Sequence, residues 1–411
     1  MITSKFSNMK CKYHIVFLLT VLLICECGRK EKNYPTEAIV IRPNSDIEGK
    51  KRHDILKVKS FADSITYVPL RLDSNTVIGK ITKILYLRNR YVLFDANLAK
   101  GIFLFDRSGK LVNQIYRGEE PFDLQSIEDV TVDYAENKIY VYSGAQSCVF
   151  QLNEDGDKER TIPISNGYFS AFEKLKDGFV FYRELEEVIN DDPFNNYRLC
   201  TVDSTGRFKK GWYNTVRNAI FPIPIASVFF RRINGTENVY FESPQYDTLL
   251  CINEIENELE DLSYIDFNKP NTPRKRVFRA RNPDEYLSAI QHSSSINEVP
   301  LITDRFILGD YSVKGGRIFE YYYERSTKET ISFSGWINDF DRIPLGAGPY
   351  YSLSNGLLIT KVDNERLLGE LELLSLKGRD LSDESQTMQE ISRIVTEQPE
   401  AIIVCLLKLK K

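Results

Sequence analysis

Short apolar runs, each ended by a polar turn, recur along most of this chain. Residues 101–105 lead into the turn 106–109 (Asp-Arg-Ser-Gly), and residues 148–152 lead into 153–156 (Asn-Glu-Asp-Gly). A third turn of this kind starts at Asp203, and the turns return about every 50 residues. Asp or Asn opens each turn and Gly supplies the left-handed position, as expected of a turn that joins two strands of a hairpin.

A period near 50 residues is typical of the four-stranded blades of a β-propeller. We recognise five such units, at about 81–118, 127–164, 169–213, 227–267 and 299–333. A last unit begins at Tyr350, while the strand around Tyr67 has no hairpin partner before it. We expect that strand to join the C-terminal strand 401–407 and complete a sixth blade, because a ring closed in this way hides its sheet edges. The sequence thus predicts an all-β fold, a six-bladed β-propeller closed by N- and C-terminal strands.

Two segments interrupt the repeat within the predicted propeller, residues 59–411. Residues 268–298 form a long insertion between blades. Residues 382–396 read as a short C-terminal helix, capped by Ser382, in which Met388, Ile391 and Val395 form an apolar stripe at helical spacing. The polar residues 28–58 read as a tether that includes one short strand at 38–41.

The first 27 residues have the pattern of a bacterial lipoprotein signal peptide. A basic start is followed by the apolar run 15–24, which is shorter than the roughly 20 residues that span a bilayer. Cys27 is the expected lipidation site, with Cys25 as the alternative and secretion without a lipid as the other outcome. We therefore expect a lipid-anchored protein of the bacterial cell envelope, at the outer membrane or the periplasmic face.

The net charge and the low histidine content argue against several classes of function. The net charge of −4 gives no reason to expect nucleic-acid binding. Only three histidines are present, and beyond the signal segment they are His53 and His292, which leaves little for a Ser-His hydrolase or a His-ligated metal. We expect no cofactor and no metal. Residues 153–159 resemble part of a calcium loop, but the sibling turn at Asp203 lacks its acid density, which favours an ordinary hairpin.

Four cysteines lie inside apolar strand segments of the predicted propeller. They are Cys148, Cys200, Cys251 and Cys405. We expect them to act as small core residues, with a disulfide between neighbouring blades as the alternative. No CxxC motif is present, which argues against a zinc site.

Several short segments of the sequence resemble those of a known family. Residues 63–70, 78–84, 102–110 and 240–248 are similar to the strands and turns of the six-bladed β-propeller lipoproteins of Bacteroidetes, which are NHL-like propellers. The resemblance covers about residues 38–411. It implies the fold and no reaction, since the family has none assigned. The loop 117–123 keeps only Gly118 and Pro121 of the family's Gly-rich segment.

Candidate binding residues lie in loops that a propeller presents on its ligand face, between blades and between second and third strands. The insertion contributes a basic group, Arg274, Lys275, Arg276 and Arg279, suited to an anionic glycan, phosphate or acidic protein surface. Trp336 and Tyr350 border other loops and could stack on sugar rings. The alternatives are a solvated loop, pairing of the insertion with the acidic loop 184–192, and aromatic packing between blades.

The function we expect is a binding or interaction module for a glycan, a peptide or a partner protein, without covalent chemistry. One alternative is a propeller hydrolase or lyase that acts on polysaccharide through carboxylates near the central channel. Another is a purely structural subunit of an envelope complex. A pair of carboxylates facing the channel would favour the enzyme, and a ligand face without such a pair would favour the binding module. An extended exposed apolar patch would favour the structural subunit.

Overall fold

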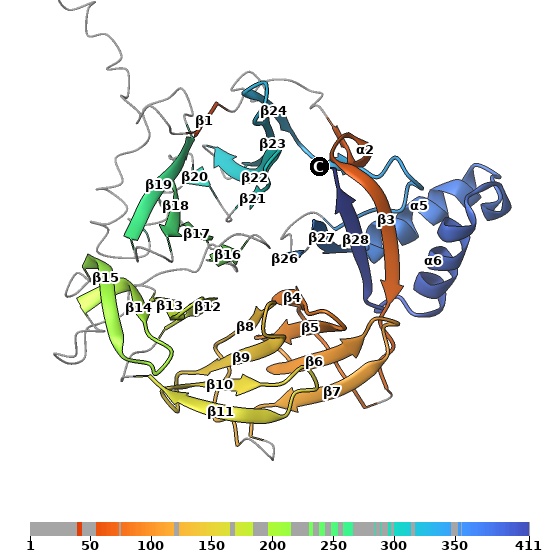
Figure 1. The fold of residues 1–411 in the computed structure, drawn as a ribbon. Coiled ribbons are helices and arrows are strands. Elements are labelled where there is room, and N and C mark those ends of the chain that lie inside the picture. Colours follow the sequence, from red (N-terminus) through yellow and green to blue (C-terminus); the bar gives the residue numbers. More distant parts are fainter. Residues whose placement is uncertain are drawn as a thin grey trace, which may run out of the picture. The chain divides into compact units, whose positions relative to one another are not determined.

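The computed structural model describes most of the predicted propeller (Figure 1). The described residues are 39–42, 55–73, 75–118, 123–164, 169–183, 196–214, 230–232, 238–242, 248–253, 258–265, 284, 288, 295–296, 300–313, 317–346, 352–354 and 356–410. The signal peptide with Cys25 and Cys27, the acidic loop 184–192, Tyr350 and the basic group of the insertion lie outside them. Among the described helices, none has the length and apolar character needed to cross a bilayer.

Six blades in a propeller arrangement account for nearly all of the described strands. Blade one consists of β4 (Lys83–Tyr86), β5 (Arg90–Asp95), β6 (Gly101–Asp106) and β7 (Leu111–Tyr116). Blade two consists of β8 (Asp129–Asp133), β9 (Lys138–Ser143), β10 (Cys148–Leu152) and β11 (Lys158–Pro163). Blade three consists of β12 (Ala171–Leu175), β13 (Gly178–Tyr182), β14 (Tyr197–Val202) and β15 (Phe208–Asn214). Within each, neighbouring strands are antiparallel and follow chain order, as the repeat predicts.

The next two blades carry additional strands. Blade four consists of β16 (Phe230–Arg232), β17 (Asn238–Glu242), β18 (Thr248–Asn253) and β19 (Glu258–Ile265). Blade five consists of β21 (Leu301–Ile302), β22 (Phe306–Val313), β23 (Arg317–Glu324) and β24 (Glu329–Phe333), and β20 (Ser295–Ile296) also pairs with β22. The strand expected at 38–41 exists as β1 (Ile39–Ile41), and it adds to blade four in parallel with β19.

Blade six combines the two ends of the propeller, which confirms the predicted closure. Its order is β26 (Ser352–Ser354), β27 (Leu357–Lys361), β28 (Ile403–Leu409) and β3 (Ala62–Pro69). The N-terminal β3 runs antiparallel to the C-terminal β28, with Tyr67 opposite Cys405. Just before β3, β2 (Leu56–Lys57) pairs in parallel with β25 (Trp336–Ile337), and a single turn of helix, α2 (Val58–Phe61), leads into β3.

The apolar core lies between neighbouring blades rather than within a single sheet. Leu104 of blade one packs in one cluster with Val130 of blade two, and Tyr142 of blade two packs with Phe172 of blade three. The series closes where Phe103 and neighbouring side chains of blade one share a cluster with Val404 of blade six. Since every sheet face is covered by the next blade, both faces of a strand can be apolar, as the fully buried run of β13 shows.

The recurring turns have the geometry that their sequences predict. The Asp106 carboxylate accepts hydrogen bonds from the backbone N–H of Ser108 (2.8 Å) and of Lys110 (3.0 Å). Asp203 and Asn153 do the same in the next two units that carry the turn. Asn153 therefore serves as the acceptor of a hairpin turn, as its siblings do. The four strand cysteines are buried thiols, as expected of core residues, and burial raises the pKa of Cys148 to about 11.

Two helices, α5 (Asn364–Leu376) and α6 (Gln386–Glu397), are inserted between β27 and β28 of blade six (Figure 1). The expected helix is α6, and its residues Met388, Ile391 and Val395 are buried against blade six. It begins at Gln386 with Ser385 as its cap, because residues 381–383 form a separate 3-10 turn. The helix α5 was not predicted.

Candidate functional site

Of the predicted binding residues, the structure describes only Trp336. Arg274, Lys275, Arg276, Arg279 and Tyr350 lie outside the described residues, so their roles stay predictions. Trp336 is described and is partly buried.

The indole ring of Trp336 meets the ring of Phe61 edge-to-face, with centroids 5.2 Å apart and an interplanar angle of 82°. Its backbone pairs with Leu56. This is the packing role that the sequence left open as the alternative, and stacking of a sugar on Trp336 stays a prediction.

The first strands of blades two and three are joined by a ladder of polar contacts. In β8, Asp129, Thr131 and Asp133 alternate with two buried valines, so the three polar side chains share one face of the strand. The hydroxyl of Thr131 donates to the carboxylate of Glu173 in β12 at 2.5 Å. Two residues on, Asp133 lies 3.6 Å from the ammonium of Lys174. These acidic groups therefore connect blades.

The ladder continues into blade one through a buried ion pair. The ammonium of Lys83, at the start of β4, lies 2.6 Å from the Asp129 carboxylate, and their side chains are only 8% and 4% exposed. The ammonium also donates to the carbonyl of Val130, while Asp129 accepts from the backbone N–H of Phe172 in blade three. A buried pair with its remaining hydrogen-bonding groups satisfied holds three blades in register.

A separate cleft of about 670 Å³ opens at one end of blade five. It lies between the turn that joins β21 to β22 and the turn that joins β23 to β24. Phe306, at the start of β22, pairs with Glu324, at the end of β23, and this register brings the two turns together. The described residues that line the cleft are polar or charged: Asp304, Arg305, Glu324, Arg325, Ser326 and Thr327.

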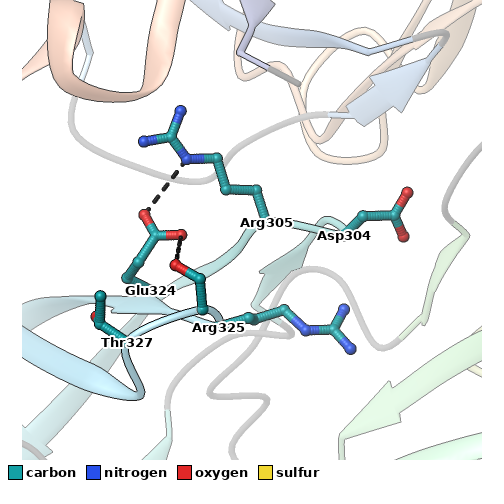
Figure 2. A pocket seen from close by; sticks show the side chains of 6 residues that line it. Asp304, Arg305, Glu324, Arg325 and Thr327 are labelled. Carbon is teal, nitrogen blue, oxygen red and sulfur yellow. Dashed lines mark hydrogen bonds and ion pairs between the residues drawn. The ribbon is translucent and has the colours of Figure 1, made fainter.

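Glu324 is the centre of a hydrogen-bond network in this cleft (Figure 2). It accepts from the Tyr322 hydroxyl at 2.7 Å and from the Ser326 hydroxyl at 3.2 Å, and it lies 3.3 Å from Nε of Arg305. Partial burial acts to raise the pKa of Glu324, but the Tyr322 hydrogen bond and the Arg305 charge outweigh it and the pKa is lowered. Glu324 is thus held as a carboxylate.

The two arginines of the cleft are each fixed through one nitrogen. Arg305 uses Nε toward Glu324, and Figure 2 shows its two terminal nitrogens directed away from that carboxylate. Arg325 donates from one terminal nitrogen to the carbonyl of Thr303 at 2.8 Å, and its backbone N–H donates to the carbonyl of Arg305. The arrangement leaves guanidinium donors, two hydroxyls and the exposed Asp304 carboxylate for a polar ligand.

Comparison with known proteins places the chain in a family. Residues 39–405 match the domain of unknown function DUF4934. The chain belongs to this family. No curated protein sequence matches it.

Two solved structures of Bacteroides proteins are similar to this DUF4934 chain. A protein from Bacteroides fragilis NCTC 9343, described as exported, superposes with a TM-score of 0.65 at 17% identity, over 91% of this chain and 100% of its own. A DUF4221 family member from Bacteroides vulgatus ATCC 8482 covers 85% of this chain and 97% of its own, with a TM-score of 0.45 and 12% identity. At these identities, the similarity to the first structure bears on the fold alone.

Sequence reasoning missed the cleft of this DUF4934 propeller. It lies at turns between first and second and between third and fourth strands, which is the face of the Asp106 turn. The sequence predicts ligand binding at the opposite face. The turns 303–305 and 325–328 carry no motif, and each alone reads as a polar hairpin turn. Only the strand register of blade five joins them.

Proposed function

We propose that this DUF4934 propeller is a binding module of the bacterial cell envelope, which holds a polar ligand without changing it covalently. The lipoprotein-type sequence of residues 1–27 supports an envelope location, with the anchor on Cys27 or, alternatively, Cys25. The similar Bacteroides fragilis protein is also described as exported.

The observation that carries this proposal is the blade-five cleft. Its lining side chains offer guanidinium and hydroxyl donors together with the Asp304 carboxylate, and its volume is within the range of ordinary ligand sites. The lining comes from two turns on a rigid pair of strands, so the donors are held in place before a ligand arrives.

The acidic groups of the described blades support binding rather than hydrolysis. A glycosidase needs two carboxyl groups on either side of the scissile bond, one of them with a raised pKa. Asp129 and Asp133 face cations of neighbouring strands, and Glu173 accepts from Thr131. Glu324 has a lowered pKa, the opposite of what a general acid requires.

The insertion remains part of the proposal as a second contact region. Its basic group, Arg274, Lys275, Arg276 and Arg279, would attract an anionic glycan, an acidic peptide or an acidic surface of an envelope protein. Trp336 and Tyr350 would add aromatic contacts to a sugar. The tether that follows the lipid anchor would keep both regions near the membrane.

An array of envelope glycans and peptides, probed with the chain from Gly28 onward, tests this proposal. We expect retention of an intact ligand, with no new product when each hit is analysed after long incubation. Binding that falls in the triple variant Arg274→Ala, Lys275→Ala, Arg276→Ala would assign it to the insertion. Cleaved product would contradict the proposal.

A further inference from the structure

We infer that the blade-five cleft recognises an acidic oligosaccharide, with Arg305 and Arg325 each binding a carboxylate on a separate sugar ring and with the hydroxyl side chains and Asp304 binding the sugar hydroxyls. This inference rests on the proposed function, because it names the ligand class of the same site. An oligosaccharide of uronic acid residues has the chemistry described.

The described lining favours a polar ligand. None of the six described residues that line the cleft is hydrophobic, and the cleft is open rather than enclosed within the core. Apolar ligands are bound in pockets lined largely by hydrophobic side chains, where they lose contact with water. A ligand of this cleft must instead exchange hydrogen bonds with water for hydrogen bonds with the protein.

The arginines favour an oxyanion of planar geometry. A guanidinium presents parallel N–H donors that match a carboxylate in a bidentate pair. The side chain of Arg305 is 36% exposed, and its terminal nitrogens are directed away from Glu324 (Figure 2). Its Nε faces Glu324, so the outer edge of the fork is the part presented to the cleft. Arg325 is fixed in the same way by the carbonyl of Thr303.

The remaining groups favour a sugar over an inorganic anion. Asp304 carries an exposed carboxylate, which repels a phosphate or sulfate dianion but accepts hydrogen bonds from sugar hydroxyls. The Ser326 hydroxyl, which donates to Glu324, can accept a hydrogen bond from the ligand, and the Thr327 hydroxyl, which accepts from the backbone N–H of Glu329, can donate one. A ligand whose carboxylates are separated by hydroxyl-bearing sugar rings satisfies both signs of the lining.

The two turns are organised before binding. The hydroxyl of Thr303 accepts from the backbone N–H of Phe306 at 2.8 Å and of Arg305 at 3.2 Å, which fixes the first turn. The backbone N–H of Arg325 donates to the carbonyl of Arg305 at 2.8 Å, which fixes the second turn against the first. Little ordering of the backbone is then needed when a ligand binds.

The test is calorimetric titration of the chain from Gly28 onward with tetragalacturonate and with its fully methyl-esterified form, which keeps the rings and removes the charge. We expect the ester to bind about tenfold or more weakly. Arg305→Ala and Arg325→Ala should each weaken tetragalacturonate binding by a similar factor. Arg305→Lys, which keeps the charge and loses the fork, should weaken it as well. Arg393→Ala, at an exposed ion pair on α6, is the control and should bind as wild type.

The outcomes separate the two proposals. Equal binding of acid and ester, or acid binding unaffected by Arg305→Ala and Arg325→Ala, would overturn the assignment to a carboxylated sugar while leaving the module able to bind other ligands. Tighter binding of inorganic phosphate than of tetragalacturonate would overturn it as well. Failure to bind any glycan or peptide on the array would overturn the proposed function itself.

Discussion

Gly109, in the first recurring turn, packs directly against the carbonyl oxygen of Pro69, at the end of the strand that closes blade six. A Cβ atom on Gly109 would lie well inside contact distance of that oxygen. Arg71, two residues after Pro69, donates its backbone N–H to the carbonyl of Gly109 at 2.7 Å. The same contact recurs between Gly206 and the carbonyl of Pro163, so this turn joins blade one to blade six and blade three to blade two.

We therefore predict that Gly109→Ala is more destabilising than its backbone conformation alone would suggest. The left-handed φ of +81° costs an alanine about 1 kcal/mol. The clash with Pro69 should add roughly 1–3 kcal/mol. Gly118 has a similar φ of +78°, but a Cβ added there would have no described residue within 4 Å, so Gly118→Ala is the matched control. Denaturant unfolding of both variants measures the difference, and equal losses of stability would rule out the packing role.

The buried pair of Lys83 and Asp129 gives a second prediction. Asp129→Asn leaves a buried ammonium without its counter-charge, and we expect a loss of about 3–5 kcal/mol in the free energy of unfolding. The double variant Lys83→Met, Asp129→Asn should recover part of this loss, because the stranded charge is removed. As a control, Glu397→Gln at the exposed pair with Arg393 should change stability by less than about 1 kcal/mol. If the double variant loses as much free energy of unfolding as the two single variants together, Lys83 and Asp129 are not coupled.

The third prediction concerns acid stability and Asp95. Its carboxylate accepts backbone N–H groups of Asn97, Leu98, Ala99 and Gly79, the last from the segment before blade one. Burial acts to raise the pKa, but these four hydrogen bonds prevail and the pKa of Asp95 is lowered. A lowered folded-state pKa contributes stability above the unfolded value of about 3.9, and this stability is lost as the pH falls through the folded value.

Asp95→Asn should therefore be less stable than wild type at pH 7 and should lose less stability on acidification from about pH 5 to pH 2. Thermal unfolding across that range measures both effects. Asp63→Asn, at an exposed position of β3, is the control, with a wild-type acid profile expected. Parallel profiles for Asp95→Asn and wild type would contradict the role given to Asp95.

Glu324 gives a fourth prediction, because it positions Arg305 rather than contacting the ligand. Glu324→Gln keeps the shape of the side chain but removes the charge that holds Nε of Arg305 at 3.3 Å. We expect binding of tetragalacturonate to weaken about three- to tenfold. Glu324→Gln combined with Arg305→Ala should be no weaker than Arg305→Ala alone. Additive losses in this double-mutant cycle would show that Glu324 acts independently.

The propeller could be predicted from the sequence because the geometry of each turn requires the residues that repeat. Each turn needs a side-chain acceptor at Asp106, Asn153 or Asp203 and a residue that tolerates positive φ, so these residues mark where strands end. The orphan strand around Tyr67 could be assigned to blade six since a closed ring leaves no other place for it. The helix α6 was recognisable from its single buried stripe.

The helix α5 and the cleft left no such signal. In α5 only Leu367 is fully buried, whereas Leu373 and Leu376 are 54% and 77% exposed, so its leucines form no clean stripe at helical spacing. The cleft depends on two turns about 20 residues apart that the register of β22 and β23 brings together. Polar turns are common in any propeller, and the sequence alone does not say which of them meet.

The most direct test of the central claim is a crystal structure of the chain from Gly28 onward soaked with tetragalacturonate. The account predicts density for an intact sugar in the blade-five cleft, with carboxylates of the sugar against the guanidinium groups of Arg305 and Arg325. Density for a cleaved sugar beside the inner strands β8 and β12, with Asp129 or Glu173 at the broken bond, would contradict it.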